Sequence, residues 1–384
     1  MPSEPMPSEP MTSESMTRES KKGILPAHAI EHLIKTQKIL MDHPCAKGQI
    51  QPASLDLRLG EVAYRVRASF LPGPDVLVQS RINDLKMHEI DLSKGGAVLE
   101  RDCVYIVPLQ ERLALDNSLC ALTNPKSSTG RLDVFTRVIC DGSRAFDQIG
   151  AGYKGPLYAE ICPQTFPVLV RTGSRLSQIR FRLEEGLENP KIALSDYPEL
   201  QRQSCSNNSL MQIRGVPLSV QLAGQKGDDL IGYRAKKHTG VIDMDAANSC
   251  DIPDFWEPIF ARGHRHLVLD PDEFYILASK ESVHVPPEYA AEMVPFNPLV
   301  GEFRVHYAGF FDPGFGHGAS GGQASKAVLE VRSHKVPFIL EDGQIIGHLI
   351  YEHLSQPPRE LYGRDIGSHY QAQSLKLSKH FKDS

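Results

Sequence analysis

The sequence lacks long apolar runs, an excess of positive charge and closely spaced cysteines. No apolar run approaches the roughly 18 residues needed to cross a bilayer, and no apolar signal core follows the first charges. The 42 Lys and Arg against 47 Asp and Glu give a net charge of −5, which argues against a polyanion-binding surface such as a DNA track. We therefore expect a cytoplasmic protein with no nucleic-acid partner and no membrane partner.

Seven Cys are present, an odd number, and none are spaced as C-x-x-C. This pattern argues against a disulfide framework and against a thiolate zinc site, so we expect reduced and mostly buried thiols. The chain has 384 residues, of which 41% are hydrophobic and 23% are charged. That composition is typical of a globular protein with room for two domains.

The pattern along the chain predicts a disordered tail, a short helix and then many strands. Residues 1–22 are rich in Pro, Ser and Glu, which predicts disorder. Ile30, Leu33 and Ile34 repeat at i, i+3 and i+4, which predicts an amphipathic helix over 26–40. Short β-type runs separated by Gly, Pro, Asn and Asp follow, as expected for a sandwich or barrel. These runs are 62–66, 76–79, 104–108, 134–139, 157–162, 167–170 and 179–183.

The second half of the chain repeats the first. Residues 158–181 align without gaps with residues 328–351, so Glu160 matches Glu330 and the copies lie 170 residues apart. The stretch between the copies is rich in Asn, Ser, Gln and Pro, which suits a linker. The predicted units are a tail over 1–22, a β-domain over 23–190, a linker over 191–210 and a second β-domain over 211–384.

Residues 125–131 carry a candidate anion site. The sequence Pro-Lys-Ser-Ser-Thr-Gly-Arg places two adjacent Ser hydroxyls, consecutive backbone N–H groups and two cations, Lys126 and Arg131, in seven residues. Such a loop can cradle phosphate oxygens with charge-assisted hydrogen bonds. The alternative is a solvated turn.

Two carboxylates of the second copy stand out. Glu330 lies in the apolar run 326–331, where loss of hydration raises a carboxyl pKa into the range useful for proton transfer near neutral pH. The alternative is a Glu on the solvent face of an edge strand. Asp312 begins an Asp-Pro-Gly turn after an apolar run, and a plain turn is the alternative there.

Six segments in order resemble the dCTP deaminases of the dUTPase superfamily. They are IQPASLDLRLG (50–60), PKSSTGRLDVFTRV (125–138), HYAGFFDPGFG (306–316), AVLEVRS (327–333), GQIIGHLIYEHL (343–354) and YGRDIGSHYQAQS (362–374). The resemblance implies an all-β dominated fold: two tandem dUTPase-like distorted β-barrels of jelly-roll type with a few short helices.

The resemblance also implies roles for individual residues. Lys126, Ser127, Ser128 and Arg131 would hold the phosphates, and one of the two Ser would orient the attacking water. Asp312 would face the deoxyribose 3′-OH, Phe311 would disfavour a 2′-OH, and the backbone at Ala308 would contact the base. Glu330 would be the general base, with Glu160, its equivalent in the first copy, as the alternative. The tail residues expected to close over the nucleotide are Tyr362, Arg364, His369, Tyr370 and Gln373, with His369 standing where the family has a basic residue.

The two copies differ in complementary ways, which favours one composite site. The first copy keeps the Ser-Ser-x-x-x-Arg motif, whereas the second has PFNPLVGEFR at the matching place. The second copy has the better Asp-Pro-Gly and Glu segments and owns the tail. In single-barrel relatives the two parts come from adjacent subunits of a trimer. The Gly- and Ser-rich stretch 316–326 departs from the family pattern and is either a lid or a long loop.

The function that the resemblance implies is hydrolytic deamination of dCTP to dUTP and ammonia, feeding dUMP and dTTP synthesis. The chain lacks the H-x-E and P-C-x-x-C set of zinc deaminases, so we expect metal-independent chemistry, with Mg²⁺ only accompanying the triphosphate. The alternatives are a dUTP diphosphatase, a bifunctional deaminase–diphosphatase, and a non-catalytic deoxynucleotide-binding protein. The sequence leaves open dTTP as a feedback ligand, and a monomer or a small homo-oligomer.

Overall fold

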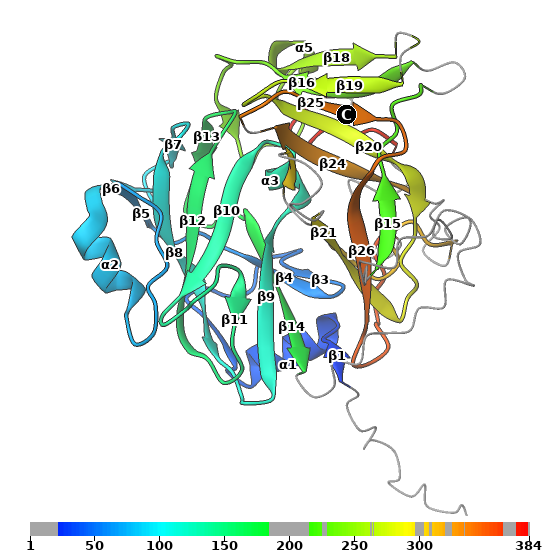
Figure 1. Cartoon of the computed structure of the whole chain (residues 1–384). Coiled ribbons are helices and arrows are strands. Elements are labelled where there is room, and N and C mark those ends of the chain that lie inside the picture. Colours follow the sequence, from blue (N-terminus) through cyan, green and yellow to red (C-terminus); the bar gives the residue numbers. More distant parts are fainter. Residues whose placement is uncertain are drawn as a thin grey trace, which may run out of the picture.

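The computed structural model describes residues 22–183, 215–224, 229–261, 263, 265–295, 303–306, 309–318, 325–333, 335–363 and 374–382. Strands dominate these residues, and the described helices are short (Figure 1). No helix in the described ranges is long and apolar enough to span a bilayer. The predicted disordered tail, apart from Lys22, and the predicted linker lie outside the described residues.

The first half contains two large sheets (Figure 1). One sheet has the order β11-β9-β14-β4-β3 with β1 beside β14, and the other has the order β10-β12-β8-β5-β6 with β2 beside β8. The bounds of their strands are β1 Gly23–Ile24, β2 Ile39–Met41, β3 Ile50–Gln51, β4 Ser54–Leu57, β5 Val62–Val66, β6 Lys86–Asp91, β8 Val104–Ala114, β9 Leu119–Pro125, β10 Val134–Cys140, β11 Gln148–Ile149, β12 Lys154–Pro163 and β14 Ser177–Leu183.

The second half contains a sheet of order β15-β26-β21-β23, a sheet of order β18-β16-β20-β24-β22 and the pair β19-β25. The bounds of these strands are β15 Val216–Ser219, β16 Leu230–Ala235, β18 Trp256–Phe260, β19 His266–Leu269, β20 Phe274–Val283, β21 Tyr289–Pro295, β22 Phe303–His306, β23 Phe310–Phe311, β24 Ser325–Ser333, β25 Phe338–Glu341 and β26 Ile345–His353.

Strand pairing repeats between the halves as the sequence does. The run β10-β12-β8-β5 corresponds to β22-β24-β20-β16, and β9-β14-β4 corresponds to β21-β26-β15. One turn contact repeats too. The hydroxyl of Tyr105 accepts a hydrogen bond from the Glu100 N–H at 3.1 Å, and that of Tyr275 accepts one from the Asp270 N–H at 3.0 Å. The all-β prediction is confirmed at this level, while the closed barrels and the domain limits remain predictions.

The halves share a core and a small sheet. Strand β17 (Ile242–Asp243) of the second half pairs in parallel with β13 (Val168–Val170) of the first, which also pairs with β7 (Ala97–Leu99). The ring of Phe166 meets those of Phe255 and Trp256 edge to face, with centroids 5.6 and 5.4 Å apart. Phe255 ends helix α5 (Ile252–Phe255). Such pairs add to the free energy gained by burying their area, so the halves are held together as one core.

The segment at residues 374–382 closes this core rather than fraying. Leu377, Ser378, His380 and Phe381 are all buried. Phe381 packs against Phe255 and Trp256, with ring centroids 5.5 and 5.9 Å away. Its backbone lies along Cys250, which receives a hydrogen bond from the Lys382 N–H at 2.9 Å.

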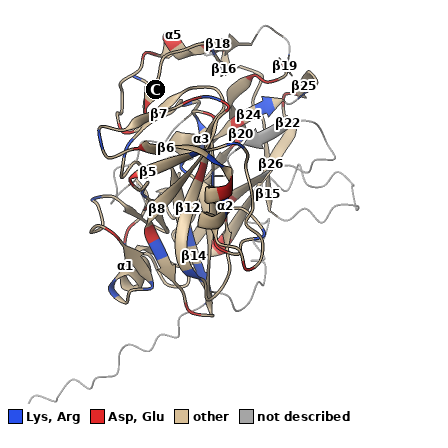
Figure 2. Cartoon of the chain, turned by 90° about the vertical axis from the view of Figure 1, so that its left-hand side faces the viewer, with Lys and Arg blue, Asp and Glu red and all other residues tan. Residues whose placement is uncertain are grey.

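Two local predictions need correction. The strand predicted over 76–79 is wrong, because Val78–Leu85 forms helix α2 with Val78 and Ile82 buried at helical spacing. The predicted helix over 26–40 exists but is shorter: α1 spans Ala27–Lys35, and Gln37 takes a positive φ of 56° before β2 begins at Ile39. In Figure 2, α2 faces the viewer, and basic and acidic residues are interspersed over the elements of this side.

Candidate active site

The candidate phosphate loop lies at the junction of the halves (Figure 1). Ser127–Gly130 form one helical turn, α3, between β9 and β10, with Lys126 before it in extended conformation and Arg131 after it. Ser128, Thr129 and Arg131 are buried, and Ser127 is half-buried. The solvated-turn alternative does not fit this burial.

Glu330 meets this loop from the other half. Its Oε1 lies 4.0 Å from Nε of Arg131, and both side chains are buried. Burial raises the pKa of the Glu330 carboxyl to about 8, although the charge of Arg131 lowers it. The exposed-edge alternative is wrong, since Glu330 lies on β24 between β20 and β22. A carboxyl with this pKa can take up and release a proton near neutral pH.

A second ion pair fixes the register of this contact. Arg332, two residues after Glu330, pairs with Asp133, two residues after Arg131. Arg332 also donates to the Thr165 hydroxyl at 2.8 Å, and that hydroxyl donates to Asp133 at 2.6 Å. The two cross-half pairs have opposite polarity, so a shift of β24 along the loop would place like charges together.

The C-terminal segment also makes hydrogen bonds to the loop. Arg131 Nη1 donates to the Lys376 carbonyl at 2.9 Å and to the Leu377 carbonyl at 3.4 Å. The buried Ser378 hydroxyl donates to the Ser128 carbonyl at 2.8 Å and lies 2.9 Å from Nδ1 of His380. Burial lowers the pKa of His380 to about 4, so this imidazole is neutral at physiological pH. The six sequence segments gave no indication of these contacts, because the last of them ends at residue 374.

Asp312 approaches the same loop at its beginning. It follows β23 and is buried, and its electrostatic neighbours are Arg180, Asp56 and Lys126. Burial raises the pKa of Asp312, and Asp56 adds to that rise, whereas Arg180 and Lys126 lower it. Lys126 itself forms an ion pair with Asp56. Phosphate loop, Glu330 and Asp312 are therefore brought together in one region between the halves.

Aromatic residues line the Asp-Pro-Gly turn. The ring of Phe315 lies between those of Phe311 and Tyr362, with centroid distances of 5.1 and 5.8 Å. The Tyr362 N–H donates to the Pro313 carbonyl at 2.9 Å. Phe311 and Tyr362 thus belong to the candidate site, whereas Ala308, Arg364, His369, Tyr370 and Gln373 lie outside the described residues.

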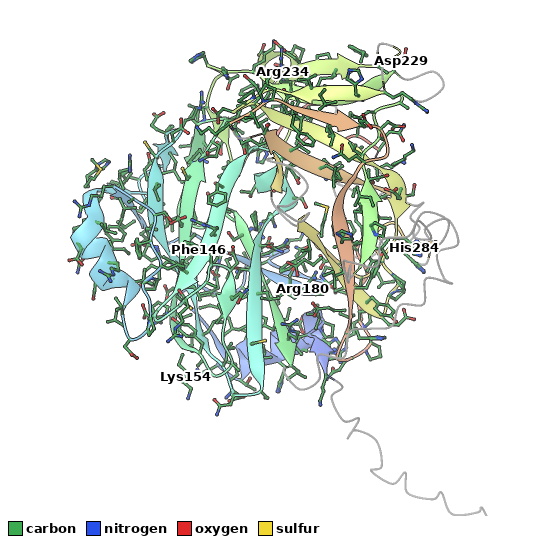
Figure 3. All side chains as sticks on the ribbon, viewed as in Figure 1. Phe146, Lys154, Arg180, Asp229, Arg234 and His284 are labelled. Carbon is green, nitrogen blue, oxygen red and sulfur yellow. The ribbon has the colours of Figure 1, made fainter. Side chains whose placement is uncertain are left out.

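Glu160 has a different environment from its repeat partner. It is buried and pairs with Arg137, directly across the β10–β12 ladder, at 2.5 Å. The Arg137 guanidinium lies over the rings of Phe135 and Phe146, 4.5 and 3.4 Å from their centroids (Phe146 is labelled in Figure 3). At the corresponding place across from Glu330 the chain has His306. The charge of Glu160 is therefore balanced by Arg137, a cation of its own half.

Comparisons with known proteins show the family of the chain. The family model described as the 2'-deoxycytidine 5'-triphosphate deaminase (DCD) N-terminal domain matches residues 21–185. The model for the C-terminal domain of the same family matches residues 191–381. The chain therefore belongs to the dCTP deaminase family.

Two curated relatives match about half of this chain, and one solved structure matches most of it. A dCTP deaminase, dUMP-forming, of Halobacterium salinarum is 33% identical over 188 residues, which are 47% of this chain and 91% of that protein. One of Coprothermobacter proteolyticus is 28% identical over 162 residues, 42% of this chain and 82% of that protein. The crystal structure of 2'-deoxycytidine 5'-triphosphate deaminase from Agrobacterium tumefaciens is similar to this structure, with a TM-score of 0.79 and a sequence identity of 58%. The match covers 87% of this chain and 99% of that chain. This chain is thus about twice as long as the first two relatives.

Proposed function

We propose that the protein hydrolyses the C4 amine of dCTP to give dUTP and ammonia, at one composite site per chain. The observation that carries the proposal is the buried contact between Arg131 of the first half and Glu330 of the second. This contact supports the proposal because the Glu330 carboxyl, whose pKa is raised to about 8, lies beside the loop that we propose binds phosphate. Membership of the dCTP deaminase family supports the same substrate.

Each residue has a defined part in the proposed reaction. Lys126, the α3 backbone and the Ser127 and Ser128 hydroxyls bind the triphosphate. Glu330 accepts a proton from a water molecule, whose oxygen attacks C4 and forms a tetrahedral intermediate. Glu330 then returns that proton to the amino group as the C4–N bond breaks and ammonia leaves, and the proton of the C4 hydroxyl passes to the ring nitrogen N3 to give the uracil carbonyl. Arg131 holds the carboxylate in place.

A second product remains a candidate because several relatives are named dUMP-forming. Such an enzyme would release dUMP and pyrophosphate rather than dUTP. Incubation of the protein with dCTP, followed by separation of nucleotides and measurement of ammonia and pyrophosphate, distinguishes the two. We expect ammonia and dUTP in equal amounts. Pyrophosphate in step with ammonia would establish the bifunctional alternative, and binding of dCTP without ammonia would establish the non-catalytic one.

Metal independence is part of the proposal, with Mg²⁺ serving only as counter-ion of the triphosphate. Among the described ranges, no three His, Cys, Asp or Glu side chains gather as a possible metal-binding group. Exhaustive dialysis against a transition-metal chelator, with Mg²⁺ then restored, is expected to leave the rate of ammonia release unchanged. A loss of rate that Zn²⁺ restores and Mg²⁺ does not would contradict this expectation.

The pH dependence follows from Glu330. The base must be ionised, and the pKa of its carboxyl is about 8. We therefore expect kcat/KM, which reports the free enzyme, to rise roughly tenfold per pH unit below that pKa and to level off above it. A stopped assay of ammonia release between pH 6 and 9.5 measures this profile. A flat profile from pH 6 upward would show that a different group limits the reaction.

A further inference from the structure

Arg180 is a first-half residue whose side chain reaches into the second half. It lies on β14 and is 3% exposed (Figure 3). Its guanidinium donates to the carbonyls of Ala291 at 3.1 Å and Phe311 at 3.4 Å. It also lies 3.4 Å from the Asp312 carboxylate and 4.0 Å from the centroid of the Phe310 ring. One planar cation therefore contacts the whole Phe310–Asp312 segment.

The repeat shows that this cation is specific to one copy. Arg180 pairs across the sheet with Leu122, whereas the corresponding pair of the second half is Ile350 with Glu292. Two residues further along β14, Arg182 is likewise an arginine of the first copy only, because Glu352 stands at the corresponding position of the second copy. Arg182 and Glu352 form an ion pair at 3.3 Å. Arg182 is part of the same interface but touches no residue of the Phe310–Asp312 segment among its described contacts. The chain thus contains two neighbouring interface arginines, of which Arg180 alone contacts Asp312.

We propose that Arg180 is a positioning residue that holds the Asp312 carboxylate for the 3′-OH of the nucleotide, and so determines how strongly the enzyme requires that hydroxyl. The proposal rests on the proposed function, in which Asp312 accepts a hydrogen bond from the deoxyribose. The Arg180 fork holds both the carboxylate and the carbonyl of Phe311 before it. A planar, multidentate donor restricts orientation in a way that a point charge does not.

The electrostatics support this role. The groups facing Asp312 are Arg180 from β14, Asp56 from β4 and Lys126 before α3. Arg180 in turn faces Asp312, Glu292 and Glu352. Without Arg180, burial and Asp56 would raise the pKa of Asp312 further, opposed only by Lys126. A protonated carboxyl is a weaker acceptor than a carboxylate, because hydrogen bonds to ionised acceptors are about twice as strong as neutral ones.

The experiment compares dCTP with 2′,3′-dideoxycytidine triphosphate, which lacks the 3′-OH. The ratio of their kcat/KM values measures the contribution of that hydroxyl. Arg180→Met and Asp312→Asn are both expected to lower this ratio about tenfold or more relative to wild type, mainly by raising KM for dCTP. In Arg180→Met, KM for dCTP should also rise as the pH falls, since Asp312 then becomes protonated. Arg182→Met, the matched control, should keep the wild-type ratio and pH dependence.

Two further variants keep the test decisive. If Arg180→Met does not fold, Arg180→Lys is used, since Lys keeps the charge but cannot form the fork, and a reduced ratio is expected. An unchanged ratio in every folded Arg180 variant, or an equal reduction in Arg182→Met, would overturn the proposal. The affinities of both nucleotides are measured by equilibrium dialysis, with Glu330→Gln added to each of the proteins compared. This measurement does not depend on turnover. If wild type releases no ammonia but these affinities respond to Arg180, the deaminase proposal fails and the positioning role stands.

Discussion

Glu330→Gln is expected to abolish ammonia release from dCTP, with kcat reduced about a thousandfold or more, because the water then has no base to take its proton. Gln has nearly the same shape and fits the same place beside Arg131, so nucleotide binding should persist. Ammonia release under saturating dCTP measures the loss. Equilibrium dialysis of dCTP shows whether the pocket remains intact.

Glu160→Gln is the matched control, since Glu160 occupies the same repeat position on a strand with the same pairing. We expect it to keep most of its turnover and to lose stability instead. Its substitution removes the charge that pairs with the part-buried Arg137 and costs about 1–3 kcal/mol. Loss of turnover in Glu160→Gln alone, with Glu330→Gln active, would refute the assignment of the base.

Phe381→Ala is expected to destabilise the whole chain and to weaken catalysis together. The ring is fully buried between Phe255 and Trp256, so its removal leaves a cavity that costs about 3–5 kcal/mol. The same segment supplies the carbonyls that accept hydrogen bonds from Arg131. The melting temperature should fall by several degrees, and KM for dCTP should rise even at temperatures where the variant is folded.

The neighbouring Lys382→Ala provides the comparison. Lys382 is exposed and pairs only at the surface with Asp251, so little change in melting temperature or KM is expected. If Phe381→Ala melts like Lys382→Ala, the C-terminal segment does not contribute to the core. If it is destabilised but KM is unchanged, the segment supports the fold without positioning the phosphate loop.

The asymmetry of the two halves supports the single composite site that we propose. In the second half the face that bears Glu330 packs against the phosphate loop of the first half. In the first half the equivalent face carries Tyr158 and Glu160, and helix α2 covers it through Val78 and Ile82. Arg137 fills the place beside the carboxylate. The sequence around Glu330 matches the family better than that around Glu160, and what packs against each strand gives the two carboxylates different partners.

The sequence by itself determined the repeat, the predominance of strands, the composition of the phosphate loop and the pair of equivalent glutamates. These are local patterns, and residue type and spacing are enough to express them. The sequence predicts a strand over 76–79 where helix α2 lies, because a short apolar run is compatible with either a strand or a helix. The four-residue spacing of the buried Val78 and Ile82 is the helical feature.

Only the tertiary structure decided which partner each glutamate has, that Arg180 reaches Asp312, and that residues 377–381 close the core. The contacts between Arg131 and Glu330, Arg180 and Asp312, and Ser378 and Ser128 join residues more than a hundred positions apart. Such contacts are set by how two sheets and a terminal segment pack around one core. The energy of a buried charge depends on that packing, and no periodicity in the chain encodes it.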